Sequence, residues 1–124
     1  MIAGALIGKN LNIQNIDQDH IQNILKVFQE LGIEFKLDKN SISLSKSNIE
    51  LGTNLQTEEY PGFPTDLQAQ MMVLLSRSKK QSSIIENIFE NRYMHVPELN
   101  RMGAQISIEG NRSTISPSDK FIGA

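Results

Sequence analysis

The fold is decided by residues 11–44, which read LNIQNIDQDHIQNILKVFQELGIEFKLDKNSISL. Alternating apolar and polar positions at its start predict a half-buried strand over 10–16. The acids that follow, and apolar residues spaced three or four apart, predict a helix that ends at Gly32. Residues 33–46 alternate on both sides of a polar turn, so they predict a hairpin.

The same order of elements returns in the second half of the chain. Residues 82–88 predict a strand, and 91–102 predict a helix with Pro97 in its first turn. Gly103 ends that helix, and alternation on both sides of Gly110 predicts a second hairpin. The two series are offset by about seventy residues, and such a repeat indicates similar units packed side by side. We therefore expect a repetitive α+β fold.

A further helix is predicted between the two series. Thr65 and Gln68 have the spacing of a capping box at its start. Its buried stripe is expected to consist of Leu67, Met71, Leu74 and Leu75. A short edge strand is expected before it, over 48–51. The apolar opening residues 1–7 lack a basic flank and are too short to cross a bilayer, so we interpret them as the end of a core-facing helix.

Composition narrows the class of function. The chain has 124 residues, of which 39% are hydrophobic and 21% charged, which suits one modest core. A formal net charge of -2 with interspersed signs provides no basic stripe for nucleic acid. The absence of cysteine excludes disulfides and thiol nucleophiles and is compatible with a reducing cytoplasm. His95 and Glu98 lack a second histidine at ligand spacing, so we expect no metal site, and no cofactor motif is present.

Two motifs within residues 60–102 resemble a known family. They read YPGFPTDLQAQ from Tyr60 and FENRYMHVPELNRM from Phe89. Both resemble the second-substrate region of the enolpyruvyl transferase family, in the UDP-N-acetylglucosamine branch that opens bacterial peptidoglycan synthesis. The resemblance implies an inside-out α/β barrel of strand-helix-strand-helix-strand-strand units. On that pattern, residues 1–46 form the rear part of one unit, residues 47–124 form a complete one, and together they make part of one lobe.

The resemblance also implies an activity. Such enzymes move enolpyruvate from phosphoenolpyruvate to the 3-hydroxyl of UDP-N-acetylglucosamine, in the bacterial cytoplasm and without a cofactor. Their mobile loop, which carries a cysteine or an aspartate, and their phosphate-binding basic residues have no match in this sequence. We therefore expect the isolated chain to be inactive and to need a complementing fragment before it can use phosphoenolpyruvate. Exposed repeat faces also make self-association plausible.

Asp66 is the predicted catalytic residue. By position alone it is an acid in the first turn of a helix, where the dipole favours its charge, and capping is the ordinary interpretation. The resemblance implies that Asp66 touches the sugar hydroxyl and accepts its proton. Ile88 and Phe89 end a predicted strand, a place where residues either join the core or face a ligand crevice. The resemblance implies a main-chain contact from Ile88 to the UDP-sugar, with Phe89 beside it.

Arg92 is the fourth predicted site residue. It lies near the predicted start of a helix, where a cation is poorly placed for the helix dipole, so we expect it to have a partner. Glu90 and Glu98 are the ordinary salt-bridge candidates. The resemblance instead implies a position near the cleft, oriented toward Asp66 or toward an anionic substrate.

Two other functions are compatible with the sequence. One is a fragment of the sibling enzyme that transfers enolpyruvate to shikimate 3-phosphate, which is disfavoured because MHVPEL and PGFPTD look like the UDP-sugar branch. The other is a non-enzymatic α+β binding module that has kept the fold and lost the reaction. Ligand titration separates the three possibilities.

Overall fold

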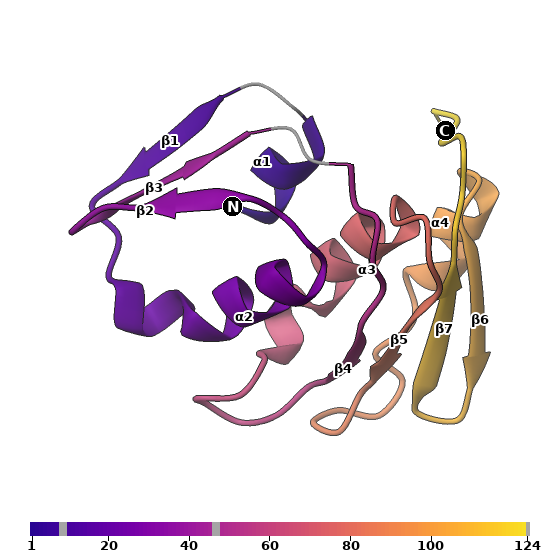
Figure 1. Cartoon of the computed structure of the whole chain (residues 1–124). Coiled ribbons are helices and arrows are strands. Elements are labelled where there is room, and N and C mark those ends of the chain that lie inside the picture. The colour runs from indigo at the N-terminus through magenta and orange to yellow at the C-terminus, as the bar shows by residue number, and fades with distance from the viewer. Residues whose placement is uncertain (8–9, 46–47, 124) are drawn as a thin grey trace.

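The computed structural model describes residues 1–7, 10–45 and 48–123, and its strands form two sheets (Figure 1). The first sheet has, in spatial order, β1 (Leu11–Gln14), β3 (Ser41–Leu44) and β2 (Phe35–Leu37). The second has β4 (Asn54–Gln56), β5 (Ser82–Ile85), β7 (Arg112–Ser116) and β6 (Gln105–Glu109). β4 runs parallel to β5, and every other pair is antiparallel.

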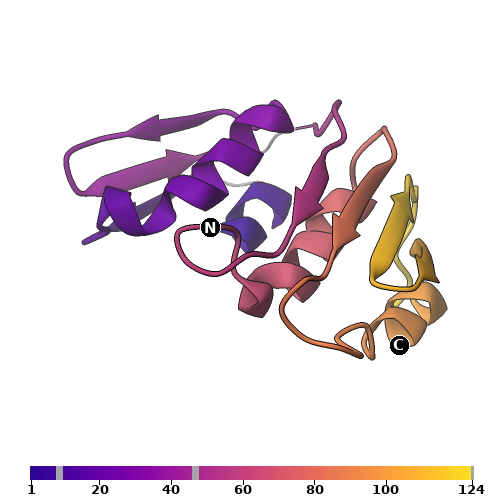
Figure 2. The ribbon, with the colours of Figure 1, turned by 90° about the horizontal axis from the view of Figure 1, so that it is seen from below.

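Helices pack against these sheets. They are α1 (Ile2–Ile7), the 3-10 helix η1 (Gln18–Ile21), α2 (Gln22–Glu30), the 3-10 helix η2 (Thr65–Leu67), α3 (Gln68–Ser76) and α4 (Val96–Arg101). Figure 1 shows α2 along one face of the first sheet, and Figure 2 shows α1 beside α3. Among the described residues, none of the helices is long and apolar enough to cross a membrane. The predicted α+β class is confirmed.

The helix α2 forms where its apolar spacing predicted it. Asp17 accepts a hydrogen bond from the backbone N–H of Asp19 at 3.0 Å, which caps the preceding η1. Phe28 is fully buried, and its ring centre lies 6.5 Å from that of Phe35 in β2. Burying a side chain of this size contributes about 1.5–3 kcal/mol. Gly32 ends the helix with a φ of +75°, a conformation that favours glycine.

The two halves share one register. Phe35 pairs with Leu44 in the first sheet, and Ile106 pairs with Ile115 in the second, so both partners are displaced by 71 residues. The spatial order β1-β3-β2 therefore matches β5-β7-β6. The internal repeat predicted from the sequence is confirmed in the strand pairing, with a sharper offset.

The helix ends obey the same offset. Gly32 and Gly103 both have a positive φ, at +75° and +108°. The residue after each glycine donates its N–H to the carbonyl five residues earlier. Among the described residues, a further segment of chain lies on the second turn. There the Ser118 hydroxyl donates to the Gly103 carbonyl, and the N–H of Ile122 donates to that of Met102 at 2.7 Å.

The strand predicted at 48–51 is wrong, and the strand lies instead at Asn54–Gln56. The carbonyl of Ile49 accepts from the N–H of Lys79, and that of Leu51 accepts from the Ser78 hydroxyl. The turn after α3 therefore uses the carbonyls that a strand would need. β4 escaped prediction because it has three residues and one apolar side chain.

Two boundaries also differ from the prediction. The strand expected over 82–88 ends at Ile85, because the N–H of Asn87 donates to the Thr57 hydroxyl instead of to a strand. The helix expected over 91–102 begins only at Val96, with Pro97 in its first turn as predicted. Asn91 has a φ of +55°, which is incompatible with a right-handed helix. Residues 86–95 consequently form a loop between β5 and α4.

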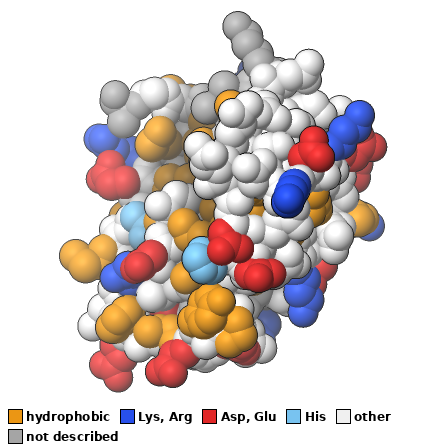
Figure 3. Space-filling model, turned by 90° about the vertical axis from the view of Figure 1, so that its left-hand side faces the viewer, with side chains coloured by type: hydrophobic (Ala, Val, Ile, Leu, Met, Phe, Trp, Pro, Cys, Tyr) orange, Lys and Arg blue, Asp and Glu red, His pale blue; other side chains and the backbone are white. Residues whose placement is uncertain are grey.

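Charges are interspersed on the surface. Figure 3 shows one face of the molecule, on which acidic and basic side chains lie among hydrophobic and neutral ones. Neither sign forms a continuous stripe across this face.

Candidate functional site

A buried carboxylate organises the end of β5. Glu86 follows the strand directly and is only 4% exposed. Its Oε1 accepts from the Thr65 hydroxyl and from Gln68 Nε2, the latter at 2.8 Å. Its Oε2 accepts from the Thr57 hydroxyl and from the backbone N–H of Ile88, the latter at 3.0 Å. Four donors on one carboxylate satisfy the charge that the fold has buried.

These donors set the ionisation of Glu86. Desolvation by burial raises the pKa of the carboxyl, but hydrogen bonds from Thr57, Thr65 and the backbone of Ile88 and Phe89 together outweigh it. The pKa of Glu86 consequently lies below its ordinary value. The group is therefore a carboxylate at neutral pH.

The predicted capping box at Thr65 and Gln68 is wrong. Pro64 stands at the N-cap of η2, and no side chain caps that helix or α3. Both predicted capping side chains instead donate to Glu86. Hydrogen bonds to an ion are roughly twice as strong as those between neutral groups, so the buried carboxylate wins over the local cap.

Asp66 and Arg92 meet in space although 26 residues separate them. Arg92 Nη2 lies 3.3 Å from Asp66 Oδ1, and the Asp66 side chain is 86% exposed. The guanidinium carbon of Arg92 lies 5.5 Å from the centre of the Phe89 ring. Of the side chains considered as partners for Arg92, the structure thus gives it Asp66, while Glu98 pairs with Arg101 at 3.2 Å. Arg92 also precedes α4, so the helix-dipole argument does not apply to it.

A groove lies beside this ion pair. It has a volume of about 810 Å³ and is lined by residues 86–94 together with Ile108, Gly110 and Asn111. We call it the 86–94 groove. Three of the predicted site residues, Ile88, Phe89 and Arg92, line it, and Asp66 touches it through Arg92. Phe89 is 54% exposed there, so it is not a core residue.

Size alone does not select this groove. A hollow of about 820 Å³ lies against the first sheet, but its charged lining residues are only Glu34 and Lys36. The 86–94 groove instead contains the buried Glu86 and the paired Arg92. Perturbed and paired charges in a concave surface favour a functional site.

Ile88 contributes its backbone in a defined way. Its side chain is half-buried and its N–H already donates to Glu86. Any main-chain contact from Ile88 to a ligand must therefore use the carbonyl oxygen. Tyr93, which also lines the groove, is fixed by its hydroxyl, which lies 3.0 Å from the carbonyl of Ile84 and 2.6 Å from that of Asn111.

Sequence reasoning missed Glu86 and Thr57. An acid that directly follows an apolar strand is the signal that could have identified Glu86, because such a residue is either a turn residue or a buried functional group. His95, for which local contacts were expected, has Nε2 at 3.1 Å from the sulfur of Met72. Burial first and then the charge of Arg92 lower the pKa of His95.

Comparison with known proteins identifies the family. The family model described as EPSP synthase (3-phosphoshikimate 1-carboxyvinyltransferase) matches residues 1–124. The chain belongs to this family. Its resemblance to the enolpyruvyl transferases, first carried by two short motifs, thus extends over the whole chain.

The curated relatives are named for the UDP-sugar reaction. UDP-N-acetylglucosamine 1-carboxyvinyltransferase of Pelagibacter ubique is 50% identical over 98% of this chain and 29% of that protein. The Koribacter versatilis enzyme of the same name is 43% identical over 100% of this chain and 29% of its own length. UDP-N-acetylglucosamine 1-carboxyvinyltransferase 1 of Caldanaerobacter subterraneus is 41% identical over 100% of this chain and 30% of that protein. The chain thus spans less than a third of the relatives it matches.

Solved structures agree on the fold. The enolpyruvyl transferase NikO from Streptomyces tendae superposes with a TM-score of 0.83 at 15% identity, over 94% of this chain and 28% of that one. EPSP synthase from Acinetobacter baumannii gives 0.68 at 12% identity, over 98% and 28%. Identities this low support the fold alone, and they confirm the predicted enolpyruvyl transferase fold.

Proposed function

We propose that this chain is the part of a UDP-N-acetylglucosamine enolpyruvyl transferase that contacts the acceptor sugar. The complete enzyme would move enolpyruvate from phosphoenolpyruvate to the sugar 3-hydroxyl, the first committed step of peptidoglycan synthesis, in the bacterial cytoplasm. The observation that carries the proposal is the ion pair between Asp66 and Arg92 at the edge of the 86–94 groove. The names of the curated relatives support the UDP-sugar as the acceptor.

Asp66 is the proposed proton acceptor. Arg92 engages Oδ1 of its carboxylate at 3.3 Å, which leaves Oδ2 to accept from the sugar hydroxyl. The 86% exposed side chain is accessible to a ligand without any movement of the core. Closure of a second lobe would exclude water and strengthen this hydrogen bond as the oxygen attacks the enol carbon.

Ile88 and Phe89 are the proposed positioning contacts for the sugar. Since the N–H of Ile88 is committed to Glu86, the Ile88 carbonyl is the acceptor that remains for an amide or hydroxyl of the ligand. Phe89 offers an exposed ring beside it, and aromatic rings provide flat apolar surfaces for ligand packing. Arg92, held over this ring and against Asp66, keeps a cation at the same edge.

The rest of the enzyme would supply the other substrate. We propose that residues 1–46 are the rear part of one repeat unit and that residues 47–124 are a complete one, together part of one lobe. The register match between the sheets supports this division. Phosphoenolpyruvate would then require a complementing fragment, and the isolated chain would not turn over. An assay that detects product above a denatured control would contradict this.

Ligand titration tests the proposal. The ¹⁵N-labelled chain is titrated with UDP-N-acetylglucosamine and, separately, with shikimate 3-phosphate. We expect saturable shifts of the amides of Asp66, Ile88, Phe89 and Arg92 with the UDP-sugar alone. Shifts produced by shikimate 3-phosphate would favour the sibling enzyme, and no saturable shift with either would favour a non-enzymatic module.

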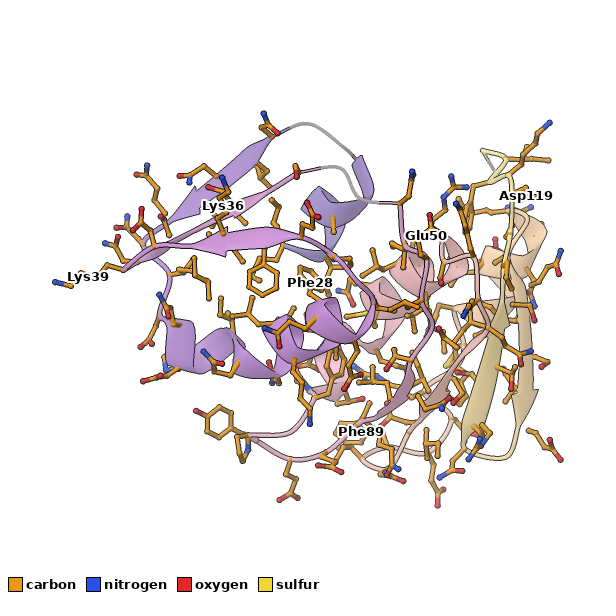
Figure 4. All side chains as sticks on the ribbon, in the orientation of Figure 1. Phe28, Lys36, Lys39, Glu50, Phe89 and Asp119 are labelled. Atoms are coloured by element: carbon orange, nitrogen blue, oxygen red, sulfur yellow. The ribbon has the colours of Figure 1, made fainter. Side chains whose placement is uncertain are left out.

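A matched pair of variants localises the binding. Asp66→Asn removes the proposed acceptor, whereas Asp119→Asn changes an exposed acid far from the site. Figure 4 shows Asp119 and Phe89 at opposite ends of the second sheet. The Asp66 variant should bind the UDP-sugar at least about tenfold more weakly, and the Asp119 variant should bind as the wild type does. Equal effects of the two changes would contradict a site at Asp66.

A further inference from the structure

We infer that Glu86 is a positioning residue of the acceptor site, which fixes the turn before Asp66 and the backbone before Phe89 in one rigid frame. The inference rests on the proposed function and adds to it a residue that does not touch the sugar.

The first support is connectivity. The Glu86 carboxylate joins three segments that lie apart in the sequence, through Thr57 after β4, Thr65 in η2 and the N–H of Ile88 after β5. Thr65 directly precedes Asp66, and Ile88 directly precedes Phe89. The buried carboxylate thus binds the residue directly before Asp66 and the residue directly before Phe89.

The second support is the division of the two oxygens. Oε1 serves the Asp66 side, where it accepts from Thr65 and Gln68, and Oε2 serves the Ile88 side. The Thr57 hydroxyl is engaged both as donor and as acceptor, since it donates to Oε2 and accepts from the N–H of Asn87 at 2.9 Å. A shift of the carboxylate would therefore move both sides together.

The third support is an unpaired atom. Gln68 Oε1 is buried without a hydrogen-bond partner in the described structure, while Gln68 Nε2 donates to Glu86. A buried unsatisfied oxygen is costly, so the orientation of this amide is set by the needs of the carboxylate. Neutral residues of similar volume could fill the same space at less cost, which favours a role in geometry over one in stability alone.

The chain offers a matched control for this cluster. The Thr53 hydroxyl donates to Glu30 Oε2 at 2.6 Å, so a second threonine–glutamate bond joins the residue before β4 to the last residue of α2. Thr53 is buried, as Glu86 is. Neither Thr53 nor Glu30 lines the 86–94 groove. Thr65→Val and Glu86→Gln can therefore be compared with Thr53→Val and Glu30→Gln.

The experiment measures affinity for UDP-N-acetylglucosamine by amide shifts of the full chain, well below the melting temperature of each variant. Thr65→Val and Glu86→Gln should weaken binding at least about tenfold, and the amides at 65–67 and 88–89 should shift without ligand. Thr53→Val and Glu30→Gln should stay within about twofold of wild type. Thr65→Ser, which keeps the hydroxyl, should restore binding. If Glu86→Gln does not fold, the comparison of Thr65→Val with Thr65→Ser still tests the inference.

The outcomes separate the two proposals. If the wild-type chain binds the UDP-sugar and Thr65→Val binds it with the same affinity, the role of Glu86 is overturned and the proposed function stands. Equal weakening in Thr65→Val and Thr53→Val also overturns it, because a general loss of stability would then explain both. A wild-type chain that does not bind the UDP-sugar overturns the proposed function and, with it, this inference.

Discussion

The chain positions after β1 and after β5 are equivalent in the fold but differ in chemistry. With the offset of 71 residues, Asn15 stands where Glu86 stands. Asn15 has a φ of +58°, and Asp17 two residues later caps its own helix. Glu86 instead turns inward, where it binds two other segments through Thr57 and Thr65 and also accepts from the N–H of Ile88. The same scaffold can therefore follow a strand either with a turn whose contacts are local or with a buried cluster of polar side chains.

The segments that follow these positions differ as well. In the first half, η1 and α2 are helical from Gln18 to Glu30. The same offset maps the start of this helical stretch onto residues 89–95, which form the loop before α4. That loop lines the 86–94 groove. The second half therefore gains its groove by leaving the first helical turns unformed.

The largest expected effect compares equivalent positions in the two halves of the chain. Phe28→Ala should destabilise the chain by about 3–5 kcal/mol, because it opens a cavity at a fully buried site. Leu99→Ala, at the equivalent position of the second half, should cost less because Leu99 is only half-buried. Urea denaturation measures both changes. A larger loss for Leu99→Ala would contradict the core as described.

The next effect isolates the buried carboxylate. Glu86→Gln should cost about 1–3 kcal/mol, because it replaces an acceptor with a donor that faces Gln68 or Ile88. The pKa of Glu86 in the folded wild type lies below its ordinary value of 4.5. The stabilisation from the charged carboxylate is therefore present above pH 4.5 and is lost as pH falls through the folded pKa. The variant should lack that acid-limb slope in denaturation curves recorded from pH 7 to 3. An acid slope as steep as that of the wild type in Glu86→Gln would refute the assignment.

A smaller effect concerns His95, which replaces Ile24 of the first half. Burial, and then the charge of Arg92, lower its pKa from the ordinary 6.5. The contribution to stability is therefore present above pH 6.5 and is lost as pH falls through the folded pKa. His95→Gln should flatten the stability profile between pH 7 and 5. His20→Gln, which removes an exposed imidazole, is the control, and an equal flattening there would argue against His95.

The smallest effect on stability belongs to the residue proposed to matter most for chemistry. Asp66→Asn should change the free energy of unfolding by less than about 0.5 kcal/mol, because exposed ion pairs contribute little. Thermal denaturation in low and high salt tests this. A loss above about 1 kcal/mol would mean that Asp66 holds the fold together and is not a free ligand contact.

Local patterns were sufficient for some elements and insufficient for others. The spacing in α2 and the stop at Gly32 are properties of neighbouring residues, so both were predictable. The cluster at Glu86 was not, since Thr65 looks like a cap until the carboxylate that follows β5 reaches it. β4 was hidden because its strand character comes from pairing with β5. Such tertiary contacts override local propensity.

The candidate site was predicted from motifs and not from periodicity. The pairing of Asp66 with Arg92 followed from the resemblance, while position alone favoured a cap for the first and a glutamate partner for the second. The helix expected around Arg92 was wrong because Asn91 reverses the backbone. The motifs thus indicated the candidate site residues, whereas their contacts with Glu86 and its partners became visible only in the folded structure.

The segment that lies on the second helix stop makes the two repeated glycines unequal under mutation. A methyl group on Gly32 would meet only the Leu51 side chain, at 3.8 Å, so alanine there would suffer backbone strain alone. The same methyl on Gly103 would stand 2.4 Å from the Lys120 carbonyl. A substitution at the first turn therefore meets backbone strain only, whereas one at the second meets strain and a clash with the backbone as long as the C-terminal residues keep their place.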